Sequence, residues 1–137
     1  MLSSDPERSP VEPGIVPLDF ALVELRLATP CRSCEGHPRD DGTWVRGPQV
    51  WFYGESSVVP ELIANHVSKL TYSKQLLLPW HVEVCPHSEC GSTTFVLICR
   101  LPDPENTSQA DVQADVRTLA FTLRDGLRAE AERRIAG

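Results

Sequence analysis

Residues 80–101 read WHVEVCPHSECGSTTFVLICRL, and this stretch decides the fold. Apolar and polar residues alternate over 80–84, a pattern typical of a strand with one buried face. A turn bounded by Cys85 and Cys90 follows, and a glycine directly after it permits the backbone conformations that tight turns need. The apolar run 93–101 then predicts a second strand. Together these features predict a hairpin with a cysteine pair at its tip.

Hydrophobic spacing predicts the remaining elements on either side of this hairpin. Residues 49–53 are aromatic and β-branched and predict a strand, while 15–28 has apolar residues at both parities and predicts a long, bent strand. Apolar residues recur at helical spacing after Ser57, and again after Ser108, which begins a capping box. We therefore expect an α+β fold, in which an antiparallel sheet of about four strands carries two helices on one face in the order ββαββα.

The length and charge of the chain restrict its organisation and its partners. The 137 residues suit one domain, and the prolines and charges of residues 1–14 predict a disordered arm before a single domain over 15–137. There are 19 acidic residues against 13 lysines and arginines, a net charge of −6, which disfavours nucleic-acid binding because few phosphates can be neutralised. No apolar segment resembles a membrane span or signal peptide, which predicts a cytoplasmic location or a virion-associated assembly.

Four of the five cysteines occur as two closely spaced pairs. Two residues separate Cys31 from Cys34, four separate Cys85 from Cys90, and each pair follows a predicted strand. In a reducing compartment such pairs indicate metal ligands or redox groups before disulfides. Four thiolates satisfy tetrahedral zinc and leave no open position, so the pairs predict a structural Zn2+ ion. The fifth cysteine, Cys99, lies in an apolar run and is expected to be a buried small hydrophobe.

Segments 30–34 and 85–91 resemble the paired cysteine turns of zinc-ribbon sites. The resemblance implies that the two turns clasp one zinc ion at the hairpin tips, and it implies nothing about activity. Three alternatives stay open at this point. In a mixed site His37 or His87 replaces one cysteine; in a second, the cysteines form two disulfides or a redox dithiol; in the third, they hold no ligand.

Two fragments match the zinc deaminases of nucleosides, namely His81-Val-Glu83 as H-x-E and residues 30–34 as P-C-x-x-C. Their order along the chain is reversed relative to that family, and His81 and Glu83 lie on the polar face of a predicted strand. For these reasons a zinc-dependent enzyme, deaminase-like or hydrolytic, that uses His81 and Glu83 is only the second hypothesis for function. His66 lies beside Asn65 on the polar side of a predicted helix and is expected to be solvated.

The aromatic residues and the long C-terminal helix indicate a binding surface. Trp51 and Tyr53 point to one face of their strand and Phe52 to the other. Either one set lies in the core and the other forms a partner-binding surface, or helices cover one face and the loop 38–48 covers the other. The C-terminal helix is longer than a four-stranded sheet needs, which leaves its end free to dimerise or dock. The leading hypothesis is a small zinc-binding adaptor or accessory protein with a protein partner or self-association, rather than an enzyme. A nucleic-acid-binding zinc module is the third.

Overall fold

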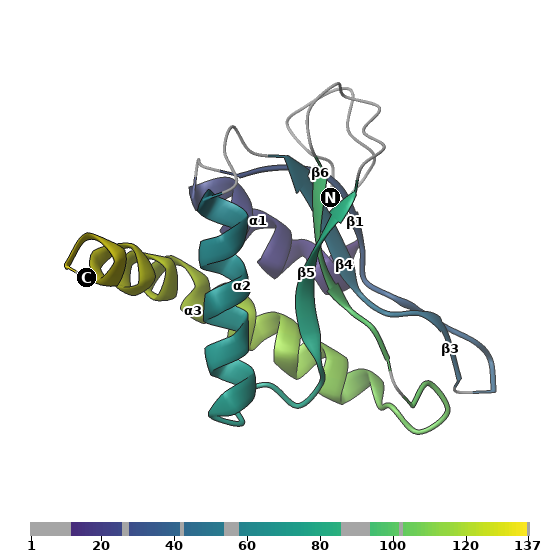
Figure 1. The fold of residues 1–137 in the computed structure, drawn as a ribbon. Helices are drawn as coiled ribbons and strands as arrows, with labels where there is room; N and C mark the ends of the chain where they lie inside the picture. The colour runs from purple at the N-terminus through teal and green to yellow at the C-terminus, as the bar shows by residue number, and fades with distance from the viewer. Residues whose placement is uncertain are drawn as a thin grey trace.

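The computed structural model describes six stretches of the chain, namely 12–25, 28–41, 43–53, 58–85, 94–101 and 103–136. Over these residues, three helices pack against one face of a four-stranded antiparallel sheet (Figure 1). The helices are α1 (Val16–Leu25), α2 (Val58–Tyr72) and α3 (Gln109–Ala136), and a short 3-10 helix, η1 (Pro13–Ile15), leads into α1. The architecture is therefore mixed α+β, as the sequence predicts, but the described residues form three α-helices rather than two and do not follow the predicted order ββαββα.

The sheet has the strand order β1-β4-β6-β5, so β1 and β5 form its two edges. The strands are β1 (Thr29–Cys34), β4 (Gln49–Tyr53), β5 (Trp80–Cys85) and β6 (Thr94–Cys99). β5 and β6 pair antiparallel, which confirms the predicted hairpin, although its tip at 86–93 lies outside the described residues. The register aligns one row of residues across all four strands: Cys34, Gln49, Ile98 and His81.

Alternation along β4 separates the two faces of the sheet. Val50 and Phe52 are fully buried on the helical side, where Phe52 stacks on Phe95 with ring centroids 5.8 Å apart. Trp51 and Tyr53 are only half-buried on the opposite face. This confirms the predicted division of the aromatic residues, because adjacent side chains of a strand point to opposite faces.

A second sheet of two short strands, β2 (His37–Pro38) and β3 (Trp44–Arg46), interrupts the connection from β1 to β4. Gly36 makes the turn into β2 with a φ of 94°, and a Cβ there would lie 2.7 Å from the ring of Trp44. Only glycine suits that combination of backbone angle and close approach. The indole of Trp44 donates to the carbonyl oxygen of Thr107 at 2.8 Å, which ties this hairpin to the turn before α3.

The strand predicted over 15–28 is wrong, because residues 16–25 of this segment form α1. Leu18 and Leu22, one helical turn apart, are fully buried, and α1 packs against both α3 and β1. Apolar residues at both odd and even positions are compatible with a helix that is enclosed by its neighbours and with a strand that is covered on both faces. The packing against α3 decides between the two.

The other two predicted helices are confirmed as α2 and α3. The hydroxyl of Ser108 accepts a hydrogen bond from the backbone N–H of Asp111 at 3.0 Å, which is the predicted N-cap. Of the predicted arm, residues 1–11 lie outside the described part of the chain, and residues 12–14 lead directly into the fold.

His66, expected to be solvated, is instead buried between α2 and α3, with 6% of its surface exposed. Its Nε2 lies 2.9 Å from the hydroxyl of Thr122, and a Cβ added at Gly126 would collide with the imidazole ring. Burial lowers the pKa of His66, and the charge of Glu130 opposes that shift. The prediction failed because helical spacing placed His66 beside the apolar stripe, and α3 covers that side as well.

Asp115 on α3 anchors the loop between α2 and β5. Its carboxylate accepts hydrogen bonds from the backbone N–H groups of Leu77 and Leu78, both at 2.9 Å, and from the indole of Trp80 at 3.0 Å. Asp115 is only 1% exposed. The three donors explain how a carboxylate is accommodated in the interior, since a buried charge is tolerated where it is hydrogen-bonded.

Candidate metal centre

The first predicted cysteine pair lies in β1, where the chain is extended rather than folded into the expected turn. A bulge leaves Cys31 out of the register with β4, and its thiol donates to the carbonyl oxygen of Trp51 at 3.6 Å. Cys34 is buried at the end of the strand. This extended backbone differs from the tight turn of a zinc-ribbon site, in which two cysteines bind one metal.

The second predicted pair begins with Cys85, which ends β5 at the opposite edge of the sheet from β1. Three strand spacings, about 14 Å, separate those edges. The side chain of Cys85, together with Cys90 and His87, lies outside the described part of the chain. The four-cysteine site therefore stays a prediction.

Cys99, the fifth cysteine, is fully buried in the core, as expected for a small hydrophobe. Burial raises the pKa of its thiol to about 12, and the nearby charge of Asp115 acts in the same direction. No disulfide joins Cys34 or Cys99 to another described residue.

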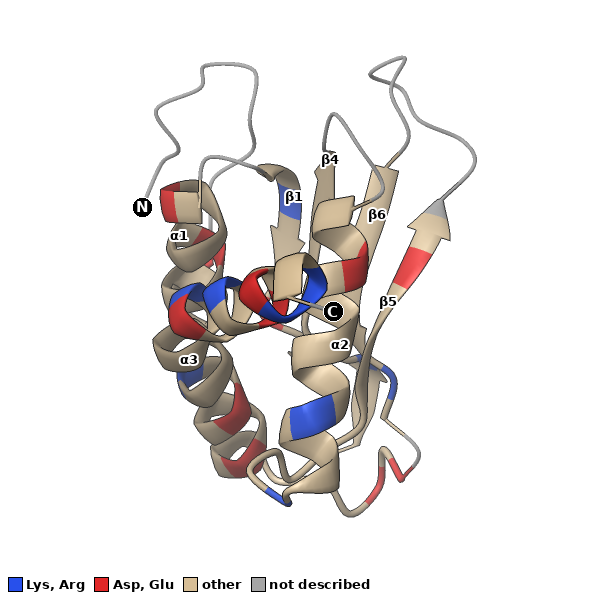
Figure 2. Cartoon of the chain, turned by 60° about the vertical axis from the view of Figure 1, so that its left-hand side comes forward, with Lys and Arg blue, Asp and Glu red and all other residues tan. Residues whose placement is uncertain are grey.

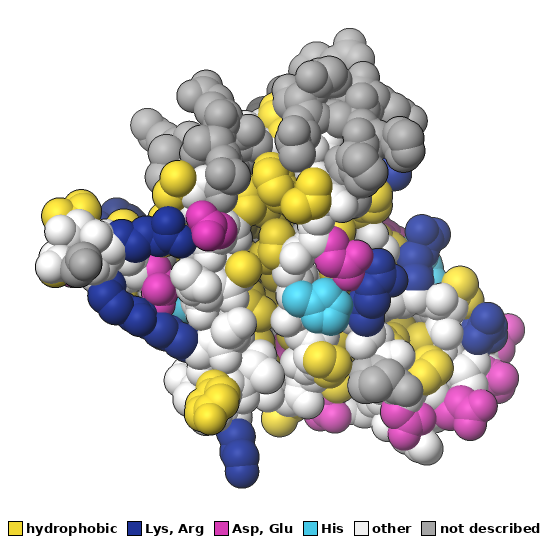
Figure 3. Space-filling model, in the orientation of Figure 1, with side chains coloured by type: hydrophobic (Ala, Val, Ile, Leu, Met, Phe, Trp, Pro, Cys, Tyr) yellow, Lys and Arg dark blue, Asp and Glu magenta, His cyan; other side chains and the backbone are white. Residues whose placement is uncertain are grey.

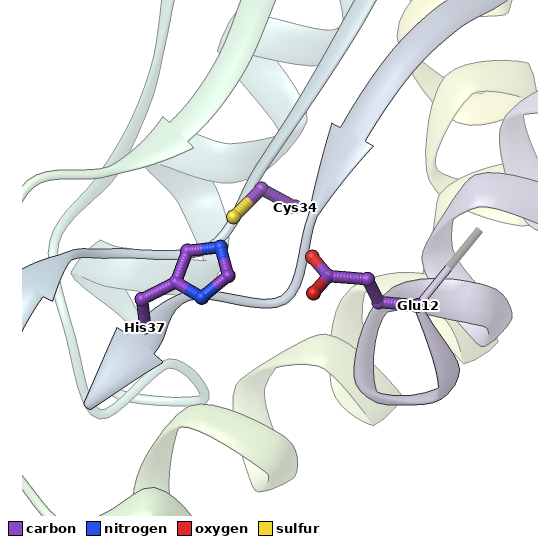
Figure 4. Close-up of side chains that lie close together, drawn as sticks. All are labelled: Glu12, Cys34 and His37. Atoms are coloured by element: carbon purple, nitrogen blue, oxygen red, sulfur yellow. The ribbon is translucent and has the colours of Figure 1, made fainter. Parts of the chain in front are cut away.

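The structure brings together a different donor set, formed by Glu12, Cys34 and His37 (Figure 4). Their ligand atoms all lie within 4.8 Å of one another. Zinc bonds to such atoms are about 2.0–2.3 Å long, so tetrahedral donors lie about 3.3–3.8 Å apart. Small side-chain movements would close this set onto an ion. Thiolate, imidazole and carboxylate are all established zinc ligands, and the thiolate selects zinc over magnesium or calcium.

A tight turn positions Cys34 and His37, which have the C-x-x-H spacing of many metal-binding turns. Gly36 supplies the positive φ of this turn, and its backbone N–H hydrogen-bonds to the Cys34 sulfur. His37 then pairs with Arg46 in the β2–β3 hairpin. The backbone thus holds the thiol and the imidazole on the same small hairpin.

Glu12 reaches the site from the residue directly before η1. Its carboxylate accepts a hydrogen bond from the backbone N–H of Glu35 at 3.1 Å, and Gly14 donates its N–H to the Glu35 carboxylate at 2.5 Å. These reciprocal contacts attach the start of the first helix to the turn between β1 and β2. The acid therefore occupies a position defined by the fold, beside the thiol.

The groups around Cys34 act on the pKa of its thiol in opposite directions. Burial raises the pKa of the Cys34 thiol, and the charge of Glu12 and a hydrogen bond with it raise it further. The Gly36 amide and the charge of Arg46 oppose these effects. A divalent ion between thiol and carboxylate would reverse the balance, because a coordinated thiol is deprotonated by the metal. Metal binding should therefore release a proton and strengthen as the pH rises.

The three donors line one hollow of about 290 Å3, here called the site hollow. Its remaining walls are Arg32, Ser33, Arg46, Gln49 and Trp51. The guanidinium of Arg32 lies over the Trp51 ring, 5.3 Å from its centroid, a cation–π geometry that orients the charge. An ion held by the three donors would thus face a cavity rather than a closed shell of protein ligands.

His81 and Glu83 lie on β5, at the other edge of the sheet from this cluster. Arg100 donates two hydrogen bonds to the Glu83 carboxylate, at 2.6 and 2.7 Å, and His81 Nε2 lies 3.4 Å from the same group. In Figure 3, histidine, acidic and basic side chains lie next to one another on the visible face of the molecule. The Arg100 hydrogen bonds lower the pKa of Glu83, which keeps it ionised and does not favour a proton-shuttle role.

Comparison with protein-family models, curated proteins and solved structures found no match. Any functional assignment therefore depends on the geometry of the site itself. Among the described residues, no helix combines the length and hydropathy needed to cross a bilayer.

Sequence reasoning identified two of the three clustered donors and missed the third. Cys34 belonged to the expected ligand set, and His37 was an alternative ligand. Glu12 was overlooked because it lies in the segment predicted to be a disordered arm. No local pattern marks it, since its approach to Cys34 depends on how α1 and β1 pack together.

Proposed function

We propose that this protein binds one zinc-class divalent cation through Glu12, Cys34 and His37, with one coordination position left exchangeable. The observation that carries the proposal is the convergence of these three donor atoms to within 4.8 Å. It shares Cys34 and His37 with the mixed alternative, in which a histidine replaces one of the four cysteines, but it has a single cysteine and adds a carboxylate. Three protein ligands and an open fourth position are typical of zinc sites that handle an exogenous ligand, whereas structural sites have four.

The decisive experiment separates this donor set from the four-cysteine site. Purified apo-protein is titrated with Co2+, a spectroscopic substitute for zinc, and then with Zn2+ in competition. One equivalent should bind, with thiolate-to-cobalt charge transfer, and saturating metal should raise the thermal midpoint because it binds only the folded state. Both candidate sites include Cys34, so Cys34→Ser should abolish tight binding in either case and serves as the shared control.

Two further variants distinguish the sites. Glu12→Gln should weaken metal binding at least about 100-fold if the cluster is correct. Even the loss of a group that only hydrogen-bonds to a metal ligand lowers metal affinity 10–100-fold. Under the same proposal Cys85→Ser should bind like the parent. The opposite result, loss of metal in Cys85→Ser with full retention in Glu12→Gln, would assign the metal to the four cysteines instead. Absence of any cobalt binding would end the metal proposal.

Self-association is a second candidate function, and Phe121 on α3 favours it. This side chain is 89% exposed and lies beside Pro17 and Ala120 in a shallow, largely apolar depression. Exposed aromatic residues of this kind are enriched in protein interfaces. Light scattering across a concentration series should then show a dimer that Phe121→Ser abolishes. A monomer at all concentrations would contradict the candidate.

Nucleic-acid binding is not favoured by the charge distribution. On the face of the helical layer seen in Figure 2, lysine and arginine residues of α3 are interspersed with aspartate and glutamate. No continuous basic stripe runs along the described residues of that face. This agrees with the net charge of −6. Weak, salt-sensitive binding at most is expected.

A further inference from the structure

The site hollow has a charge pattern that the three metal ligands do not explain. Arg32 and Arg46 both line it, next to the donors. Arg32 is held against Trp51, and Arg46 lies opposite His37 in the hairpin register. Within the described stretches of the chain, neither guanidinium forms an ion pair with an acidic side chain.

The charge balance changes when a cation is bound. The two charges of the ion would be matched by the Cys34 thiolate and the Glu12 carboxylate, while His37 stays neutral as a ligand. The positive charges of Arg32 and Arg46 would then have no matching acidic charge among the residues that line the site hollow. Positive charge in a partly enclosed space attracts anions, and guanidinium groups recognise carboxylate and phosphate in a two-pronged geometry.

The size of the hollow limits what it can hold. Its volume of about 290 Å3 lies at the lower end of small-molecule sites, which span roughly 300–1,000 Å3. Gln49 offers a further polar group on one wall, although its amide oxygen already accepts from the Trp51 indole at 2.6 Å. Ser33 and Trp51 complete the lining. These dimensions suit a compact ligand with one anionic group and little else.

We propose that the site hollow binds a small oxyanion, a carboxylate or phosphate group, that fills the open coordination position of the metal and contacts Arg32 and Arg46. This inference rests on the proposed metal site and specifies the class of its exogenous ligand. The anion replaces a metal-bound water, so ligand exchange requires no other chemistry. Binding should depend on the metal, because without it the Glu12 carboxylate repels an incoming anion.

The test uses the cobalt-loaded full-length protein, with sodium acetate and inorganic phosphate as separate probes at constant ionic strength. At least one probe should shift the visible cobalt spectrum saturably, with a millimolar or lower dissociation constant. The two probes distinguish a carboxylate from a phosphate preference. Arg46→Ala and Arg32→Ala should each weaken that binding about tenfold or more, with cobalt affinity unchanged. Arg46→Lys should restore it only in part, because lysine lacks the two-pronged geometry.

Arg124→Ala is the matched control, since this exposed arginine lies on α3, away from the site hollow, and should behave like the parent. All three arginines are exposed, so circular dichroism should confirm that the variants fold. If cobalt binds but neither probe changes its spectrum, the oxyanion inference is overturned and the metal proposal stands. Equal weakening by Arg124→Ala would also overturn it, as a general charge effect. If cobalt does not bind, both proposals fail together.

Discussion

Replacing Asp115 with alanine should destabilise the fold by about 3–5 kcal/mol, and this figure follows from its three hydrogen bonds. Each bond to a charged acceptor contributes roughly 1.5–3 kcal/mol, and each donor left buried without a partner costs roughly 1–3 kcal/mol. Loss of the hydrogen bond to the Trp80 indole should contribute the largest share, because that residue is only 4% exposed. The amides of Leu77 and Leu78 lie nearer the surface and can be hydrated in part, so the three terms do not add fully.

Urea unfolding followed by circular dichroism measures this loss directly. A domain of this size has a total stability of roughly 5–15 kcal/mol, so Asp115→Ala should remain folded unless the parent lies near the lower end of that range. The thermal midpoint should fall by about 10–20 °C. Asp115→Asn keeps the side-chain volume and one acceptor oxygen, and should lose about half as much.

Asp111→Ala provides the matched control on the same helix. Asp111 is exposed in the first turn of α3, where a carboxylate contributes at most about 1 kcal/mol through the helix dipole. If Asp115→Ala lost less than about 1 kcal/mol, or no more than Asp111→Ala, the anchoring role would be refuted. The favourable hydrogen bonds would then merely offset the cost of burying the charge.

Three further predictions concern His66, Gly126 and Glu83. Because burial lowers the pKa of His66, the unfolded chain binds its proton first, so stability should decline as the pH falls below about 6.5; His66→Gln should reduce this decline, measured by urea unfolding at several pH values. Gly126→Ala should cost about 1–3 kcal/mol, because the added methyl collides with the imidazole. Arg100→Ala should raise the pKa of Glu83 toward its ordinary value, measured by NMR titration, since Arg100 supplies the largest stabilisation of that carboxylate.

Each of these predictions has an outcome that contradicts it. If His66→Gln lost as much stability at low pH as the parent, other groups would be responsible for that loss. The exposed residue His81 provides the control, because His81→Gln should leave the pH dependence of stability unchanged. A Gly126→Ala variant as stable as the parent would show that the helices separate without cost. An unchanged Glu83 titration in Arg100→Ala would mean that the ion pair does not persist in solution.

Periodicity along the chain was sufficient for most of the elements. The spacing of apolar residues, which repeats within one or two helical turns or strand pleats, predicts four of them. These are the helices over 58–72 and 109–136 and the strands over 49–53 and 80–85. The opposite orientations of Trp51 and Phe52 follow from the same local geometry. Sequence alone was therefore sufficient wherever the determining pattern was short-range.

Tertiary packing decided the features that spacing did not predict, including those that build the proposed metal site. Residues 16–25 form a helix because α3 covers them, and His66 is buried because the same helix closes over it. The strand order sets β1 and β5 at opposite edges, which separates Cys34 from Cys85 along the sheet. Glu12 joins Cys34 only through the contact between the start of the first helix and the turn after β1. Residue spacing does not predict such contacts, because they depend on which segments, distant in the sequence, pack against one another.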